Sequence, residues 1–487
     1  MSYIEGECRE QTTLFPESIE DFVDGNHPVR FIDAFVESLD LVELGFKRAL
    51  PTTMGRPAYH PSDLLKLWLY GYFYKIRSSR TLARETHRNV ELFWLVKRLR
   101  PDFRTIADFR KDNRKAIHKL FGQFMLLCHK LDLIGEDLIA IDGSKFKGVN
   151  SKKRNLTQSR IKMLLRRIDK DIQKYLNQLD ETDQREKGLG SFLVENGEEK
   201  LTQLKAMLKE DRQEIQKKLQ RSQEKKRHLE QTKEEFEKKD VKQVSLTDPD
   251  SRKMKTSQGA LVGYNVQTAV DEKHHLIVAV DVSQDTNDQN QLSSMVHQTK
   301  EVIKNEHPNI VADKGYFKEA EIAACEEIAN VYVPKPEQAN TRTGLFPKAM
   351  FLYNAKENTY KCPAGQILTE RAKYKKTGEK IYTTTQCSRC PLKEKCTPNQ
   401  RTIRRSKHAD AVDRMTERLK HKPDMMKKRQ AMVEHPFGTI KSSFGYRDFL
   451  TKGMESVRAE MSLAALIYNL KRVINVLGVE PLLASLT

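Results

Sequence analysis

The sequence predicts an α/β fold, a mixed sheet with helices, to which helical and cysteine-rich parts are added. Two short apolar runs, Leu138–Ser144 and Ile310–Tyr316, each end in an aspartate followed by turn residues. Buried strands that deliver a carboxylate to the edge of a sheet have this pattern. Between the two runs, residues 158–240 contain no proline and are rich in Lys, Glu, Gln, Arg and Leu. That composition predicts a helical hairpin inserted into the sheet domain.

Residues 1–137 are predicted to form a helical N-terminal domain. The apolar residues of Val29–Leu39 fall on one stripe, as in an amphipathic helix. His60–Asp63 carries the signals of a helix start, and an aromatic-rich helix then extends to Ile76. These aromatics could form the core of an ordinary helical bundle, which is the alternative to a DNA-binding domain.

A polar turn, Arg77–Ser79, separates this helix from another predicted over Arg80–Arg88. A helix, a short turn and a second helix form the outline of a helix-turn-helix. Arg77 and Arg80 are therefore candidate contacts to DNA phosphates. Lys145, where a basic run begins after the first strand, is a third candidate.

The charge of the chain favours a nucleic-acid partner. Its 487 residues carry 86 Lys and Arg against 67 Asp and Glu, a formal net charge of +19. Such an excess attracts DNA or RNA, although a merely soluble basic protein would share it. No run approaches ~18 consecutive apolar residues, and the first residues have no apolar signal segment. We therefore expect no membrane partner and a cytoplasmic protein, nucleoid-associated when bound to DNA.

The pattern of strands and helices divides the chain into four parts. Residues 138–155, 241–338 and 420–480 are assigned to one discontinuous α/β catalytic domain that follows the helical domain. Residues 156–240 form the hairpin or coiled-coil insertion, and residues 339–419 a cysteine-rich insertion.

Carboxylates at strand ends are the candidate catalytic residues. Asp142 and Asp313 end the two apolar runs, and carboxylates placed side by side hold Mg²⁺ for phosphoryl transfer. Glu434 is the best third candidate, and Lys441 lies two helical turns further on, where it could bind a phosphate. Pro436 is expected to disturb this helix. An exposed Glu and Lys on a surface helix is the alternative.

Four of the seven cysteines are clustered, at Cys362, Cys387, Cys390 and Cys396. Aromatics and prolines surround them, with few residues that could build a core. In a reducing compartment this clustering predicts a tetrahedral, structural Zn²⁺ site rather than disulfides. Four thiolates leave no open position, so we do not expect a catalytic zinc. Redox chemistry and inert thiols are the alternatives.

Several motifs, in this order, resemble a DDE transposase of a bacterial insertion sequence. They include Pro101–Arg110, Ala140–Ser144, Ala312–Tyr316 and Val433–Gly438, and the likeness runs from about residue 15 to residue 476. The branch it resembles has a helical N-terminal domain and a cysteine-rich insertion before the last acidic residue. The resemblance implies an RNase H-like core with one Asp on the first strand, one on the fourth and a Glu on a later helix.

Asp142, Asp313 and Glu434 match those three acidic positions. The family also carries a tyrosine, arginine, glutamate and lysine signature on its last helix, for which Arg429 and Lys441 are the arginine and lysine candidates. Met426 stands at the tyrosine position, and Arg429 precedes Glu434 by five residues rather than four.

The resemblance implies metal-dependent cleavage at the terminal inverted repeats of a transposon and strand transfer into target DNA. Two Mg²⁺ ions, or Mn²⁺ in their place, would be held by the three acidic residues, with Asp142 bridging both. A homodimer is expected in the active complex, because two DNA ends are joined. The alternatives are an RNase H-like nuclease without strand transfer and a DNA-binding protein with an inactive transposase site.

Overall fold

The computed structural model describes residues 18–51, 57–150, 155–188, 198–239, 243–256, 259–336, 344–374 and 377–486. The chain divides into two compact units. The larger consists of Met1–Phe146 with Asn265–Thr487, and the smaller of Lys147–Tyr264. Among the described helices, none combines the length and the apolar composition needed to cross a bilayer.

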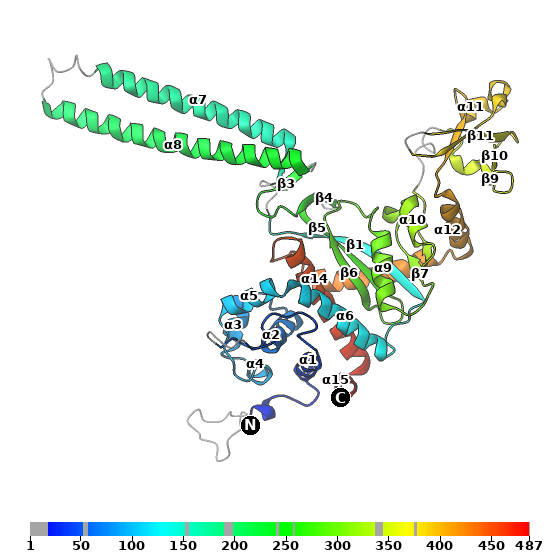
Figure 1. Ribbon diagram of the computed structural model, residues 1–487, viewed down its shortest axis with the longest axis horizontal. Helices are drawn as coiled ribbons and strands as arrows, with labels where there is room; N and C mark the ends of the chain where they lie inside the picture. The colour runs from blue at the N-terminus through cyan, green and yellow to red at the C-terminus, as the bar shows by residue number, and fades with distance from the viewer. Residues whose placement is uncertain are drawn as a thin grey trace, which may run out of the picture. The chain divides into compact units, whose positions relative to one another are not determined.

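The N-terminal part of the larger unit is helical (Figure 1). Proline occupies the first helical position of both α1 and α2, each preceded by a histidine cap, a position where the missing N–H costs nothing. The aromatics of α2 are mostly buried, Trp68 completely, so they form the core of a helical bundle. The elements are η1 (Ile19–Phe22), α1 (Pro28–Glu37), α2 (Pro61–Phe73), α3 (Ser79–Glu85), α4 (Val90–Leu95), α5 (Phe103–Asp112) and α6 (Arg114–Lys130).

The predicted α/β class is confirmed by a mixed sheet. Strand β1 (Leu138–Lys147) pairs in parallel with β7 (Asn309–Val311), which pairs in parallel with β8 (Asn330–Tyr332). On the other side of β1 lies β5 (Gly259–Asp271), whose second half is antiparallel to β6 (Ile277–Ser283). Helices connect the later strands: α9 (Leu292–Val302), η4 (Lys314–Tyr316) and α10 (Glu319–Cys325).

The C-terminal helices complete this core. Helix α14 (Met454–Leu477) is buried along most of its length and packs on α6, α2 and β6. Asn469, fully buried on α14, hydrogen-bonds the backbone N–H and carbonyl of Ile277 on β6, both at 2.8 Å. This helix therefore joins the N-terminal helices to the sheet. Its neighbours are α12 (Ala409–His421), α13 (Met425–Gly438), the π-helical turn η8 (Thr439–Ser443) and α15 (Val479–Ala484).

The cysteine-rich segment forms an antiparallel sheet in the order β13–β12–β11–β10–β9. The expectation that it has few core residues is wrong, because Phe351, Tyr360, Leu368, Tyr382 and Ile403 are buried together in a small core. The aromatics counted as surroundings of the cysteines supply this core. The elements are η6 (Lys348–Met350), β9 (Leu352–Asn354), β10 (Thr359–Lys361), β11 (Ile367–Lys373), β12 (Lys380–Thr383), η7 (Thr385–Arg389), α11 (Lys393–Cys396) and β13 (Thr402–Arg405).

The smaller unit contains the predicted helical hairpin. Helices α7 (Gln158–Gly188) and α8 (Glu198–Lys239) pack side by side (Figure 1). At their base, β2 (Asn155–Thr157) pairs with β3 (Gln243–Ser245), and Leu156, Ile161 and Leu229 form a small core. Strand β4 (Arg252–Thr256) pairs with the first half of β5.

Candidate active site

The first two predicted acidic residues lie next to each other. Strands β1 and β7 are parallel, and their register pairs Ala140 with Val311. Asp142 and Asp313 each follow two residues later, so they lie level with each other on neighbouring segments. The prediction that Asp142 ends its strand is wrong, because β1 continues to Lys147, whereas Asp313 does follow the end of β7. Asp313 caps the turn η4, where its Oδ1 accepts a hydrogen bond of 2.8 Å from the N–H of Gly315.

Asp142 is largely buried and lies close to charges of both signs. Its pKa is raised to about 6, chiefly by burial, and the negative charges of Asp313 and Asp288 contribute to the rise. The guanidinium of Arg429 acts in the opposite direction. A carboxylate that is both desolvated and close to other carboxylates is stabilised by any cation that reaches it.

Arg429 is the cation that reaches Asp142. Its Nη2 lies 2.6 Å from Asp142 Oδ1, with side-chain exposures of 15% for the arginine and 24% for the aspartate. Helix α13 is positioned for this contact because Met432 and Val433 pack against apolar residues of β1 and β7. Arg429 therefore contacts the first aspartate directly, and its binding to a DNA phosphate stays a prediction.

Lys441 lies in the same region. Its Nζ donates hydrogen bonds to Ser144 Oγ at 2.6 Å and to the carbonyl of Lys145 at 2.9 Å, and it lies 4.3 Å from the ring centre of Phe146. Burial lowers the pKa of Lys441 to about 8, partly opposed by the charge of Asp142. The amine is therefore close to its titration point near neutral pH.

Helix α13 departs from regular α-helical geometry after Pro436, as a π-helical turn. Helix α13 continues through Pro436 to Gly438 and then widens into the π-helical turn η8, where the N–H of Phe444 bonds the carbonyl of Thr439 at 2.9 Å. π-Helical turns often occur at functional sites. Here the turn contains Lys441.

Glu434 is not joined to the two aspartates by any described contact. It is exposed on α13, and its Oε1 accepts a hydrogen bond of 2.9 Å from Gln430. Among the described residues, no group of three or more His, Cys, Asp or Glu side chains is arranged to hold a metal ion. The place of Glu434 in a triad therefore stays a prediction.

Arg77 has a different role from the predicted phosphate contact. Its side chain is 13% exposed, and Nη1 bonds the carbonyl of Asp448 at 2.8 Å and Glu460 at 3.4 Å. Because these partners occupy the guanidinium, we do not retain Arg77 as a DNA contact. Arg80 is exposed, with its guanidinium 5.2 Å from the ring centre of Phe103.

Lys145 lies at the site, but its charge is engaged. Its Nζ is 3.0 Å from Asp288 Oδ1, and the lysine side chain is 15% exposed. Asp288 and Gln267, which bond each other at 2.8 Å, were missed in the sequence. Asp288 follows strand β6 within a polar loop, and proximity to a strand end was the one signal that could have pointed to it.

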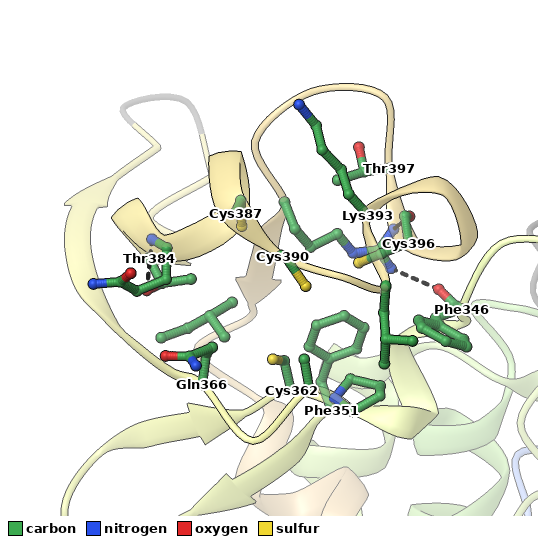
Figure 2. Close-up of a pocket in the computed structure, with 16 residues that line it drawn as sticks. Phe346, Phe351, Cys362, Gln366, Thr384, Cys387, Cys390, Lys393, Cys396 and Thr397 are labelled. Carbon is green, nitrogen blue, oxygen red and sulfur yellow. Dashed lines mark hydrogen bonds between the residues drawn. The ribbon is translucent and has the colours of Figure 1, made fainter.

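The four clustered cysteines line one pocket, with Phe351, Leu368 and Leu392 among its apolar walls. Figure 2 shows the four around this pocket, with the sulfurs of Cys362 and Cys390 facing into it. All four thiols are free. Within the described part of the chain they are not arranged as a group of three or more metal ligands, so the zinc site stays a prediction. Burial raises the pKa of the Cys396 thiol, and the three other cysteines raise it further, which indicates that the four groups interact.

Two family models match the chain. The first, described as Transposase domain (DUF772), matches residues 17–112, and the second, described as Transposase DDE domain, matches residues 361–474. The second match covers the cysteine cluster and helix α13 with Arg429, Glu434 and Lys441. Neither the curated proteins nor the solved structures searched gave a match.

Proposed function

We propose that the chain is a DDE transposase of an insertion sequence, as its two transposase family matches support. It would cleave the terminal inverted repeats of a transposon and transfer the cut strands into target DNA. Transposases act on DNA, and the DDE domain implies the use of divalent metal ions. The observation that carries the proposal is the position of Asp142 level with Asp313 on neighbouring segments, with Arg429 and Lys441 beside Asp142.

The donor set fits Mg²⁺, because carboxylate oxygens are its preferred protein ligands and the two aspartates repel each other without a cation. Two Mg²⁺ ions, or Mn²⁺, held by Asp142, Asp313 and Glu434, would activate water or a 3′-hydroxyl and stabilise the leaving oxygen. Asp142 would help to hold both ions, as the family resemblance implies, and its burial beside Asp313 supports a role in binding a cation.

The cationic side chains bind and orient the DNA strand. Arg429 neutralises Asp142 in the metal-free site, and its guanidinium becomes available to a phosphate once another cation takes over that role. Lys441 is held by Ser144 and the Lys145 carbonyl, so its charge stays fixed close to Asp142. A fixed charge stabilises the negative phosphate without reorganisation at the moment of reaction.

The order of strands along the chain supports an RNase H-like core. Counting β1, β5, β6 and β7 as its strands, Asp142 lies on the first and Asp313 directly after the fourth, and Glu434 lies on the later helix α13. These are the three positions that the family resemblance implies.

DNA binding by the N-terminal helices, through a helix-turn-helix-like arrangement, completes the proposal. Helices α2 and α3 are separated by a short turn, and Arg80 is exposed at the start of α3. The formal net charge of +19 favours the DNA backbone. A homodimer would bring two transposon ends together.

The assay uses a terminal-repeat duplex, with Mg²⁺ and the full chain. Wild type should nick or break the repeat end and join it to a second duplex, while Asp142→Ala should do neither. Asp132→Asn is the matched control, since Asp132 is 91% exposed and its described ion pair is with Lys273 rather than with a residue of the site. Cleavage by Asp142→Ala at the wild-type rate would refute the assignment. Cleavage without joining supports the nuclease alternative, and metal-independent binding without cleavage supports the inactive DNA-binding protein.

We also propose a structural Zn²⁺ on Cys362, Cys387, Cys390 and Cys396. The support is that four free thiols line one pocket with apolar walls, since structural zinc sites with four thiolates are closed. Metal analysis of purified protein should give about one equivalent of zinc, lost in Cys390→Ser but kept in Ser388→Ala. Less than about half an equivalent, with all four thiols free to react, would refute the site.

A further inference from the structure

Asp288, in the loop after β6, gathers three side chains on one carboxylate oxygen. Its Oδ1 accepts from Asn265 Nδ2 at 2.6 Å, Gln267 Nε2 at 2.8 Å and Lys145 Nζ at 3.0 Å. Asn265 and Gln267 are fully buried on β5, and Lys145 comes from β1. An anion with three donors, one of them charged, holds its partners more firmly than neutral hydrogen bonds would.

Asp288 and its partners pack closely against Gly143, the residue that follows Asp142. A Cβ at Gly143 would lie 2.6 Å from Gln267 Nε2, 2.7 Å from Asp288 Oδ1 and 3.0 Å from Tyr316 Oη. Real Cβ contacts are essentially never found below 3.0 Å, so a side chain at position 143 would force Gln267 or Asp288 to shift. The backbone beside the first aspartate is therefore in contact with Asp288 and its partners.

The same cluster reaches the segment of the second aspartate. Tyr316, three residues after Asp313, is 1% exposed, and its hydroxyl donates to Gln267 Oε1. Gln267 thus uses its amide N–H on Asp288 and its carbonyl on Tyr316, which satisfies both ends of the buried side chain. One glutamine links the two aspartate-bearing segments, and Asp288 orients that glutamine.

We propose that Asp288 is a positioning residue that, through Gln267, Gly143 and Tyr316, sets the separation of the Asp142 and Asp313 carboxylates. The inference rests on the proposed function in one respect, that the two aspartates bind a divalent metal. Groups that orient metal ligands from behind typically change metal affinity or activity by about 10- to 100-fold when they are replaced.

The test measures Mn²⁺ binding to the full chain by calorimetry, with binding that remains in Asp142→Ala subtracted. Asp288→Asn should weaken Mn²⁺ binding by about 10-fold or more. Its cleavage should fall at limiting Mn²⁺ and recover at saturating Mn²⁺, which a general loss of fold would not allow. Asp285→Asn is the control from the same loop, because Asp285 bonds Gln291 at 2.7 Å rather than the cluster; both readouts should stay at wild-type values.

Tyr316→Phe removes the hydroxyl that bonds Gln267, at the opposite end of the Asp288–Gln267–Tyr316 linkage. It provides a second test in case Asp288→Asn does not fold. It should also weaken Mn²⁺ binding, and the double variant should lose less than the sum of the two single losses, because both act through Gln267. Unchanged Mn²⁺ affinity in the folded single variants would overturn the proposal, as would strictly additive losses. Wild type that binds Mn²⁺ but never cleaves DNA would refute the proposed function while leaving this inference intact.

Discussion

Two arginine–carboxylate pairs in the larger unit differ in how completely the acid is bonded. Glu460 on α14 is 3% exposed and, besides Arg77 at 3.4 Å, accepts from the N–H groups of Leu450 and Thr451 at 3.0 Å. Asp142 is 24% exposed and has Arg429 at 2.6 Å, but Asp313 opposes its ionisation.

The difference shows that the same type of pair, an arginine with a carboxylate, can stabilise the fold in one place and belong to a proposed active site in another. Glu460 is saturated with donors, so another cation has nothing to gain there, and the pair fixes the N-terminal helices to α14. Asp142 is buried near a second carboxylate, Asp313, which adds to the cost of its negative charge while Arg429 reduces that cost. A carboxylate in such surroundings has more to gain from a further cation than Glu460 has, which is why we propose a metal ion at Asp142 and a structural role for Glu460.

Asp313→Asn should show the largest effect on DNA cleavage. A variant with unchanged cleavage would contradict the contrast between the Arg429–Asp142 and Arg77–Glu460 pairs. Loss of one metal ligand should lower cleavage about a thousandfold, since several kcal/mol of transition-state stabilisation at about 1.4 kcal/mol per tenfold are removed. The metal-free melting temperature should not fall, because a repulsion with Asp142 is relieved. Single-turnover cleavage and thermal unfolding check both parts. A large loss of Tm would mean that Asp313 serves the fold.

Glu460→Gln tests the structural pair in the same way. It leaves Arg77 charged and largely buried, with only the long 3.9 Å contact to the half-exposed Asp448 carboxylate. The free energy of unfolding should therefore fall by roughly 3 kcal/mol. Chemical denaturation measures this. The control is Glu455→Gln on the same helix, where the ion pair with Arg114 spans 3.8 Å and the glutamate is 58% exposed; its effect should stay below about 1 kcal/mol. Equal losses would remove the contrast.

The pH dependence of stability and of Mn²⁺ affinity should further distinguish the Arg429–Asp142 pair from the Arg77–Glu460 pair. The pKa of Asp142 is raised to about 6 in the fold, so its contribution to stability is present below its ordinary value and is lost as pH rises through about 6. In the same range a proton competes with metal, so Mn²⁺ affinity should drop about tenfold per pH unit below 6. Calorimetry from pH 5 to pH 7 checks this. A pH-independent affinity would contradict it.

Cleavage should fall again at alkaline pH, as Lys441, with a pKa of about 8, loses its charge. Lys441→Arg should move this upper limb beyond the measurable range, because the guanidinium stays protonated. A rate profile at saturating metal shows the limb directly. If wild type and variant lost activity together above about pH 8, another group would be responsible.

The smallest expected effect distinguishes Arg80 from Arg77. Arg80→Ala should weaken DNA binding and reduce the slope of log affinity against log salt by about one, without changing Tm, since an exposed phosphate contact is lost. Arg77→Ala should lower Tm through Glu460 and leave the salt slope unchanged. Fluorescence anisotropy at several salt concentrations measures the slopes. If Arg77→Ala instead reduced the salt slope and left Tm unchanged, Arg77 would be assigned to the DNA-binding surface.

Local patterns were enough for much of the fold. The two apolar runs became β1 and β7, and the proline-free stretch became α7 and α8. These predictions succeeded because strand and helix periodicity is written in neighbouring residues. The strand end was predicted correctly at Asp313 but not at Asp142, since β1 continues to Lys147. The small core under the cysteines was missed, since its residues are spread over separate strands of one sheet.

Sequence by itself determined which side chains could bear the chemistry: the aspartates of two apolar runs, an arginine and a lysine on the last helix, and four clustered cysteines. Only the tertiary structure decided which cations meet which acids. In the structure Arg429 contacts Asp142, Arg77 contacts Glu460, and Asp288 lies against Gly143. The reason is physical: burial and charge pairing depend on segments hundreds of residues apart, and no local pattern records which of two arginines a buried carboxylate will meet.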